Sequence, residues 1–169
     1  MNINSKIAGI LSLAFLCLAC ACSKKASPPA VSQDPLNRVR NAPAVPPKHF
    51  LHKTFRVGTY TNFPFEVPAH ATNPKLQGSF KSFLPGSNPD SASDAANVDF
   101  MLMNSEQFDA FAHDRGGMAP YSISAAHDQS VDYALPATLE EPTKYYVVFR
   151  NSGDPKQARM VLADFTVSF

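Results

Sequence analysis

The sequence predicts an all-β protein: an antiparallel β-sandwich of about eight strands with one short helix, which follows a signal peptide and a disordered tether. Apolar and polar residues alternate with a period of two through most of residues 53–169, and turn-forming residues interrupt this alternation every ~8–12 residues. Six of the 15 prolines fall between residues 28 and 47, which is typical of a linker. We therefore predict a signal peptide over 1–21, a tether over 22–52 and one β-domain over 53–169.

The amino-terminal residues have the composition of an export signal. Lys6 precedes an uncharged stretch from Ile7 to Cys22, which is shorter than the ~20 apolar residues of a membrane-spanning helix. The stretch ends in Leu18-Ala19-Cys20-Ala21-Cys22, where small residues come before a cysteine. This arrangement resembles the bacterial lipobox, in which the cysteine is acylated and becomes the first residue of the mature chain. The resemblance implies lipidation of Cys22, with Cys20 as the alternative; a plain secreted protein and an uncleaved anchor are the competing interpretations.

The lipoprotein resemblance also implies a location and a partner. The acylated cysteine inserts into a lipid bilayer, so the domain is expected to be anchored in the cell envelope. Ser23 follows Cys22, whereas an aspartate at that position favours retention in the inner membrane. We therefore expect the outer membrane, with the domain facing the periplasm or the cell surface.

Charge and cysteine usage narrow the function classes. Residues 1–52 carry six basic side chains and one acidic side chain, whereas residues 53–169 carry nine basic and 13 acidic ones. A mildly acidic domain argues against nucleic-acid binding, which needs a basic face to neutralise phosphates. The three cysteines all precede residue 23, so the domain has no disulfide framework and no cysteine-based metal site.

The first half of the domain contains four predicted strands. Their alternating apolar positions are Phe55 and Val57; Phe63, Phe65 and Val67; Leu76, Phe80 and Leu84; and Val98, Phe100 and Leu102. Pro64 interrupts the second strand, which predicts an edge strand or a bulge because proline cannot donate a ladder hydrogen bond. Residues 85–90 contain two prolines and a glycine and predict a turn or loop.

A short helix separates these strands from the second half. Asn104 and Gln107 have the spacing of a capping box, Phe108 and Phe111 follow at helical spacing, and Gly116-Gly117 predicts the stop. Further strands are expected at 120–125, at 130–135 and around the alternation of Tyr145, Val147 and Phe149 with polar and apolar neighbours. The chain closes with one apolar stripe, made of Val161, Ala163, Phe165, Val167 and Phe169.

The order of these segments is similar to bacterial exported β-sandwich domains of unassigned function and, more distantly, to the GOLD-type jelly-roll domain of the p24 cargo receptors. The residues that carry the resemblance are 98–103, 108–111, Leu135-Pro136, 145–151 and the closing alternating strand. The p24 domains have a cystine and a following membrane helix, which this sequence lacks, so cargo reception is not implied. The resemblance implies a binding or accessory module without catalytic machinery, since a fold alone does not give a function.

The sequence offers one candidate binding surface. Tyr145 and Tyr146 are adjacent, so one ring is expected in the core and the other on the opposite face of the sheet. Aromatic residues at a surface can mark interfaces, and we predict a binding surface around Tyr145, Tyr146 and Arg150. The expected partner is an envelope protein or a glycan. No catalytic residue, metal or cofactor is predicted, because nucleophile-elbow, dinucleotide-binding and P-loop motifs are absent from the sequence.

Two alternative functions stay open on the sequence. A metal-dependent hydrolase would use the pairs His113-Asp114 and His127-Asp128, which supply possible ligands if the fold brings them together. A small outer-membrane β-barrel is suggested by the alternating stripe that ends in Phe169. However, membrane-spanning strands need ~9–11 residues each, and most of the predicted strands are shorter or interrupted by proline.

Overall fold

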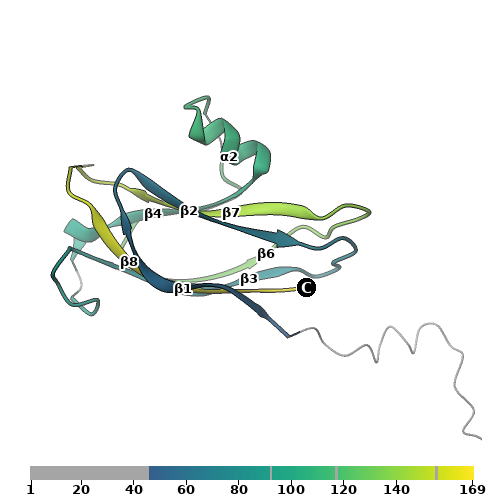
Figure 1. Cartoon of the computed structure of the whole chain (residues 1–169), viewed down its shortest axis with the longest axis horizontal. Coiled ribbons are helices and arrows are strands. Elements are labelled where there is room, and N and C mark those ends of the chain that lie inside the picture. The colour runs from purple at the N-terminus through teal and green to yellow at the C-terminus, as the bar shows by residue number, and fades with distance from the viewer. Residues whose placement is uncertain (1–45, 92, 117, 155) are drawn as a thin grey trace, which may run out of the picture. The chain divides into compact units, whose positions relative to one another are not determined.

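The computed structural model describes residues 46–91, 93–116, 118–154 and 156–169. Its eight strands form two four-stranded antiparallel sheets, which confirms the predicted all-β sandwich with one α-helix (Figure 1). The predicted signal peptide, the candidate acylation sites Cys22 and Cys20, and the tether up to residue 45 lie outside the described residues. Within the described part, no helix is both long enough and apolar enough to cross a membrane.

The two sheets have the strand orders β1-β8-β3-β6 and β2-β7-β4-β5. The first sheet consists of β1 (Lys48–Val57), β8 (Arg159–Ser168), β3 (Lys75–Phe83) and β6 (Asp128–Ala134). The second consists of β2 (Tyr60–Val67), β7 (Thr143–Asn151), β4 (Val98–Asn104) and β5 (Tyr121–Ala126). A 3₁₀ turn, η1 (Asp94–Ala96), precedes β4, and the helix α2 (Ser105–Ala112) follows it. This strand order is that of a jelly roll.

The folded domain begins earlier than the predicted boundary at residue 53. β1 starts at Lys48 and pairs with β8, so residues 48–52, which were predicted to be tether, belong to the sheet. Leu51 is buried opposite Phe165. A β-bulge between His49 and Leu51 shifts the register, which breaks the period-two alternation that identifies a strand in the sequence.

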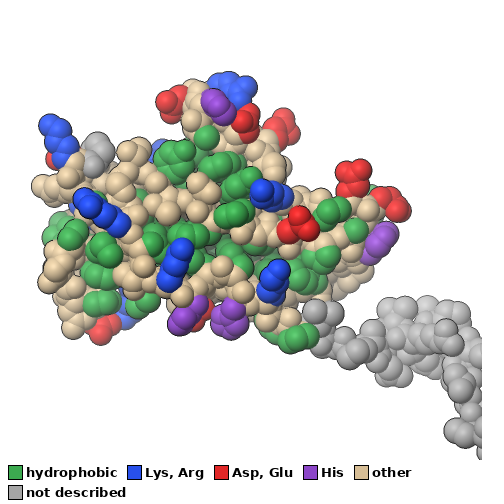
Figure 2. Space-filling model, in the orientation of Figure 1, with side chains coloured by type: hydrophobic (Ala, Val, Ile, Leu, Met, Phe, Trp, Pro, Cys, Tyr) green, Lys and Arg blue, Asp and Glu red, His purple; other side chains and the backbone are tan. Residues whose placement is uncertain are grey.

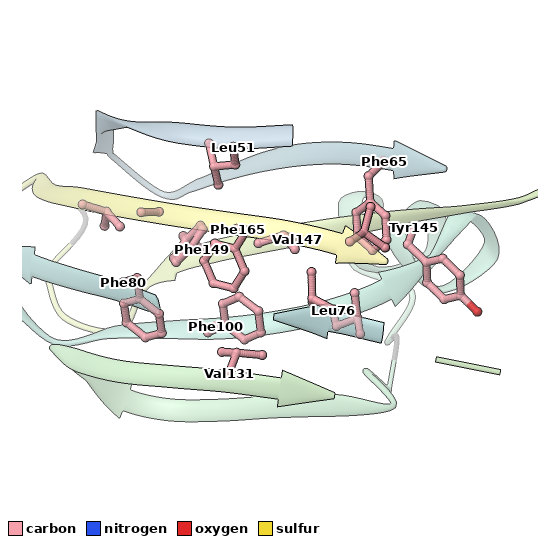
Figure 3. Packing of buried hydrophobic residues seen from close by; sticks show 14 of the residues in the cluster. Leu51, Phe65, Leu76, Phe80, Phe100, Val131, Tyr145, Val147, Phe149 and Phe165 are labelled. Carbon is pink, nitrogen blue, oxygen red and sulfur yellow. The ribbon is translucent and has the colours of Figure 1, made fainter. Parts of the chain in front are cut away.

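The core lies between the two sheets and is rich in phenylalanine (Figure 3). Phe149 of β7 packs against Phe80 and Phe165 of the opposite sheet, with ring centroids 5.3 and 6.3 Å away, and against its neighbour Phe100 at 5.5 Å. Phe100 stacks nearly parallel on Phe165 at 5.5 Å. These four rings are fully buried and join the sheets. Aromatic pairs at such distances stabilise by about 0.5–1.5 kcal/mol beyond their buried area.

β4 is buried on both faces because α2 covers the outer face of its sheet. Met101, Met103 and Val148 form a second apolar cluster, against which Phe108 and Phe111 of the helix pack. The predicted capping box is confirmed: Asn104 accepts from the Gln107 amide, and Gln107 accepts from the Asn104 amide, both at 2.9 Å. No residue of the helix is fully buried, and hydrophobic side chains reach the surface just below α2 (Figure 2).

Two local predictions have different outcomes. β2 is an edge strand, as Pro64 predicts, because it pairs only with β7. The helix ends at Ala112 rather than at Gly116-Gly117. Asp114 has a positive φ of 52°, so the chain already leaves the helical conformation there.

Candidate functional site

The three residues predicted to form a binding surface lie on two faces of β7, with Tyr145 on the inner face and Tyr146 and Arg150 on the outer face. Tyr145 is buried on the inner face of β7, whereas Tyr146 lies on the outer face and stacks on Phe108 at 4.2 Å. The predicted separation of the two rings onto opposite faces is therefore confirmed. Arg150 lies further along β7, where it pairs with Asp99. Arg150 lines a hollow of about 270 Å³ with Phe111, Asp114 and Gly116 on the outer face. Tyr145 instead lines a cleft between the two sheets.

That cleft lies at the end of the sandwich where β6 ends and β7 begins, and we call it the tyrosine cleft. It has a volume of about 210 Å³ and is lined by Asn104, Gln107, Pro120, Tyr133, Pro136 and Tyr145. The phenol of Tyr145 points away from the other labelled core residues (Figure 3). None of the lining side chains carries a charge at neutral pH, so the cleft suits an uncharged ligand.

The polar groups of the cleft are held by the capping box of α2. The side-chain oxygens of Asn104 and Gln107 are both used to accept backbone amides. Their NH₂ groups make no hydrogen bond to another described residue, and each offers two donors. The capping box thus fixes the orientation of both amides at the cleft wall and occupies their oxygens rather than their NH₂ donors.

The aromatic walls are equally well supported. Tyr145 stacks on Phe65 with a centroid distance of 5.7 Å, and Tyr133 packs against Tyr121 at 4.9 Å. Burial, and secondly the neighbouring Tyr133, raise the pKa of Tyr145 above the ordinary tyrosine value. Its hydroxyl therefore stays protonated at neutral pH and can both donate and accept a hydrogen bond.

A shallow polar hollow lies elsewhere, on the outer face of the other sheet. It measures about 400 Å³ and is lined by His49, Gln77, Gly78, Ser79, Asp164 and Thr166. The Nδ1 atoms of His49 and His52 lie 3.4 and 3.0 Å from the two carboxylate oxygens of Asp164. This hollow is more open than the tyrosine cleft and has no aromatic wall. Across the described ranges, no group of three histidine, cysteine, aspartate or glutamate side chains is arranged to hold a metal ion.

The residues of the hydrolase hypothesis are spread over different elements. His113 lies at the end of α2 and contacts Asp109, whereas His127 lies between β5 and β6 and contacts Asn97. Asp128 lies 3.9 Å from Lys81. The two pairs thus have separate sets of neighbours, and the described residues give this hypothesis no support.

Asp99 and Arg150 form the most buried ion pair of the described residues. The Nε and Nη2 atoms of Arg150 lie 3.0 and 2.7 Å from Oδ2 of Asp99. The other oxygen of Asp99 accepts from the amide of Ala125, a residue held at a positive φ of 49°. The Asp99 side chain is 9% exposed and that of Arg150 is 50% exposed. The pair thus joins β4, β7 and the end of β5.

We expect the two partners to respond unequally to substitution. Arg150→Met leaves the carboxylate of Asp99 nearly buried without its counter-ion, so it should cost about 3 kcal/mol of unfolding free energy. Asp99→Asn should cost about 1–2 kcal/mol, because the half-exposed guanidinium stays hydrated and the amide oxygen still accepts from Ala125. Urea unfolding of both variants measures the difference. Equal losses of unfolding free energy in the two variants would contradict the argument that the buried carboxylate is the costlier partner to leave unpaired.

Comparisons with known proteins leave the chain without a family. No family model and no curated protein matches it. Among solved structures, it is similar to TmCBM61, described as solved in complex with β-1,4-galactotriose. The two share 13% identity with a TM-score of 0.39, over 68% of this chain and 67% of the other. Likeness at this level says nothing of function, so the class of the protein rests on its own fold: a jelly-roll β-sandwich with an uncharged cleft at one end.

Proposed function

We propose that the protein is a lipid-anchored, extracytoplasmic, non-catalytic binding module whose tyrosine cleft takes the end of an uncharged glycan chain. The observation that carries the proposal is the chemistry of the cleft: two phenols, two prolines and two oriented amides, with no charged side chain. Ligand sites are typically apolar walls with a few well-placed polar groups. A sugar ring matches such a site, because its C–H faces pack on aromatic rings while its hydroxyls pair with the amides and phenols.

The size of the cleft restricts what enters it. Its volume of about 210 Å³ lies below the ~300–1,000 Å³ of sites that enclose drug-sized ligands. The cleft therefore suits a terminal sugar unit, with the rest of the chain outside. The un-ionised phenol of Tyr145 adds one donor and one acceptor to the cleft lining.

The anchored location rests on the amino-terminal sequence. The uncharged leader, the small residues before Cys22 and the proline-rich tether are the features of an exported lipoprotein. One acyl chain binds a membrane only marginally, so a firm anchor needs the several chains of a lipoprotein. Ser23 favours the outer membrane, where the domain would face the periplasm or the cell surface.

Metabolic labelling with a fatty-acid analogue tests the anchor. We expect Cys22→Ser to lose the label and Cys20→Ser, the matched control, to keep it. Uptake by the Cys20→Ser, Cys22→Ser double variant at the level of the unaltered protein would rule the lipid anchor out. Loss of label in Cys20→Ser alone would move the acylation site to Cys20.

Two tyrosine-to-phenylalanine substitutions in the full-length protein test whether the tyrosine cleft binds a glycan. The protein is applied to an array of uncharged envelope glycans, and the affinity for the best ligand is then measured. Tyr145→Phe removes a hydroxyl from the cleft and should weaken binding about 2- to 10-fold, the range for one neutral hydrogen bond. Tyr146→Phe makes the same change one residue away on the other face and should leave binding unchanged. Absence of binding on the array, or equal losses in both variants, would overturn the proposal.

A further inference from the structure

The opposite end of the sandwich contains a buried arginine, Arg159, at the start of β8. Its register position opposite Val57 directs it toward the interior, and it is 5% exposed. Arginine is almost never fully buried in a protein unless it is paired, because removing the charge from water is costly. Yet no carboxylate oxygen of a described residue lies within 4.0 Å of this guanidinium.

The hydrogen bonds of Arg159 leave the Nε atom of the guanidinium without a partner among the described residues. Nη1 donates to the carbonyl of Gln157, and Nη2 lies against Gly153. Nε is buried and has no hydrogen-bond partner, and it is the one side-chain atom of the described residues in this condition. A buried, unmet donor of this kind costs about 1–3 kcal/mol, so its presence needs an explanation.

Arg150 shows how the same edge is used when an anion is present. Its Nε and Nη2 both donate to one carboxylate oxygen of Asp99. The corresponding edge of Arg159 carries no such partner. Among the described residues, Arg150 thus has a carboxylate partner and Arg159 has none.

Arg159 lines a pocket of about 290 Å³, which we call the arginine pocket. Its lining residues are Asp94, Ala95, Asn97, Ala125, Ser152, Gly153 and Arg159. Its walls are tied together: the Ser152 hydroxyl donates to the carbonyl of Asn97 at 2.8 Å, and the Asn151 side chain holds the β7–β8 turn through the Gly153 amide at 3.0 Å. A Cβ atom on Gly153 would lie 2.7 Å from Nη2 of Arg159, so glycine makes room for the guanidinium.

We propose that the arginine pocket binds the carboxylate of a small polar molecule, which completes the pairing of Arg159. A guanidinium edge matches a carboxylate through two parallel hydrogen bonds. Asp94 at the rim adds one negative charge, which disfavours a doubly charged phosphate more than a singly charged carboxylate. The pocket is larger than a bare carboxylate, and its Asn97 and Ser152 side chains suit further polar groups on the ligand. This site is independent of the tyrosine cleft and of the proposed function.

The test is a titration of the full-length protein with acetate, glucuronate and inorganic phosphate at constant ionic strength. The Nε–H resonance of Arg159, assigned by its loss in Arg159→Lys, is followed by NMR. We expect a saturable shift with acetate and glucuronate, with glucuronate saturating at lower concentration. No saturable shift with either carboxylate, or an equal shift with chloride, would overturn the proposal. If phosphate saturated the shift at a lower concentration than acetate and glucuronate, the assignment of the pocket to a carboxylate would be overturned.

Two variants separate ligand binding from a purely structural role. Arg159→Met should fold with unchanged or higher stability, because replacing an unpaired buried charge by an apolar side chain of similar size removes its desolvation cost. The same variant should bind glucuronate at least about tenfold more weakly by calorimetry, since charge-assisted hydrogen bonds are lost. Arg56→Met, at an exposed arginine, is the matched control and should bind normally. Unfolding of Arg159→Met together with normal glucuronate binding by Gly153→Ala, which displaces the guanidinium, would assign Arg159 a structural role instead.

Discussion

A chain that ends at Gln157 is expected to remain unfolded, because it lacks β8. This strand lies between β1 and β3 and is hydrogen-bonded to both over most of its length. Its inward side chains Val161, Phe165 and Val167 are completely buried. Burial of each contributes about 1.5–3 kcal/mol, so their sum approaches the whole ~5–15 kcal/mol stability of a domain. The loss of two strand interfaces comes in addition.

Circular dichroism and thermal unfolding of the purified chain measure this effect. The matched control is a chain that lacks only Phe169, which lies outside β8 and is half-buried. That control should unfold cooperatively at a moderately lower temperature. A cooperative transition in the chain that ends at Gln157 would show that β1 and β3 can close on each other, contrary to the expected result.

The strands that the sequence predicts well are those whose alternation is not interrupted. β8 alternates cleanly, since it faces the core with one side, and it is a central strand. β1 was predicted to begin too late because its bulge shifts the alternation. β4 and the middle of β7 are buried on both sides, since α2 covers their outer face at Met101, Met103 and Val148. Such coverage depends on a tertiary contact, so the alternation along these strands does not reveal it.

The tyrosine cleft could be predicted only in part. Tyr145 was singled out from the sequence, and the capping box of Asn104 and Gln107 was correctly placed. However, the register that puts Asn104 opposite Tyr145 pairs strands far apart in the chain, and Tyr133 comes from the other sheet. A jelly roll joins such segments through long connections, so the sequence spacing of cleft residues carries no signal of their proximity.

The sequence contains a signal for the burial of Arg159. This arginine precedes the apolar stripe of β8 in phase with Val161 and Ala163, both of which point inward. A charged residue in phase with a buried stripe is directed toward the core if the strand is continuous. The lack of a counter-ion among the described residues, however, cannot be predicted from the sequence, because it depends on where the fold positions the acidic side chains.

Phe149→Ala is the point substitution with the largest expected effect on stability. The Phe149 ring contacts five other aromatic rings, three of them from the opposite sheet, with centroid distances of 5.2 to 6.5 Å; these are Phe55, Phe63, Phe80, Phe100 and Phe165. Truncation to alanine leaves a cavity between two hydrogen-bonded sheets, which cannot collapse without breaking strand pairing. We therefore expect a loss of about 3–5 kcal/mol of unfolding free energy.

Urea unfolding measures this loss, provided that the slope of the unfolding free energy against urea concentration is the same in the variant and in the unaltered protein. Leu139→Ala, at a side chain that is 80% exposed, is the control and should stay within about 0.5 kcal/mol of the unaltered protein. Phe149→Leu keeps much of the volume but loses the ring contacts, so its stability should fall between the two. If Phe149→Ala changed the free energy by less than about 1 kcal/mol, the rings would not be the link between the sheets, and the paired strands alone would have to hold the sandwich together.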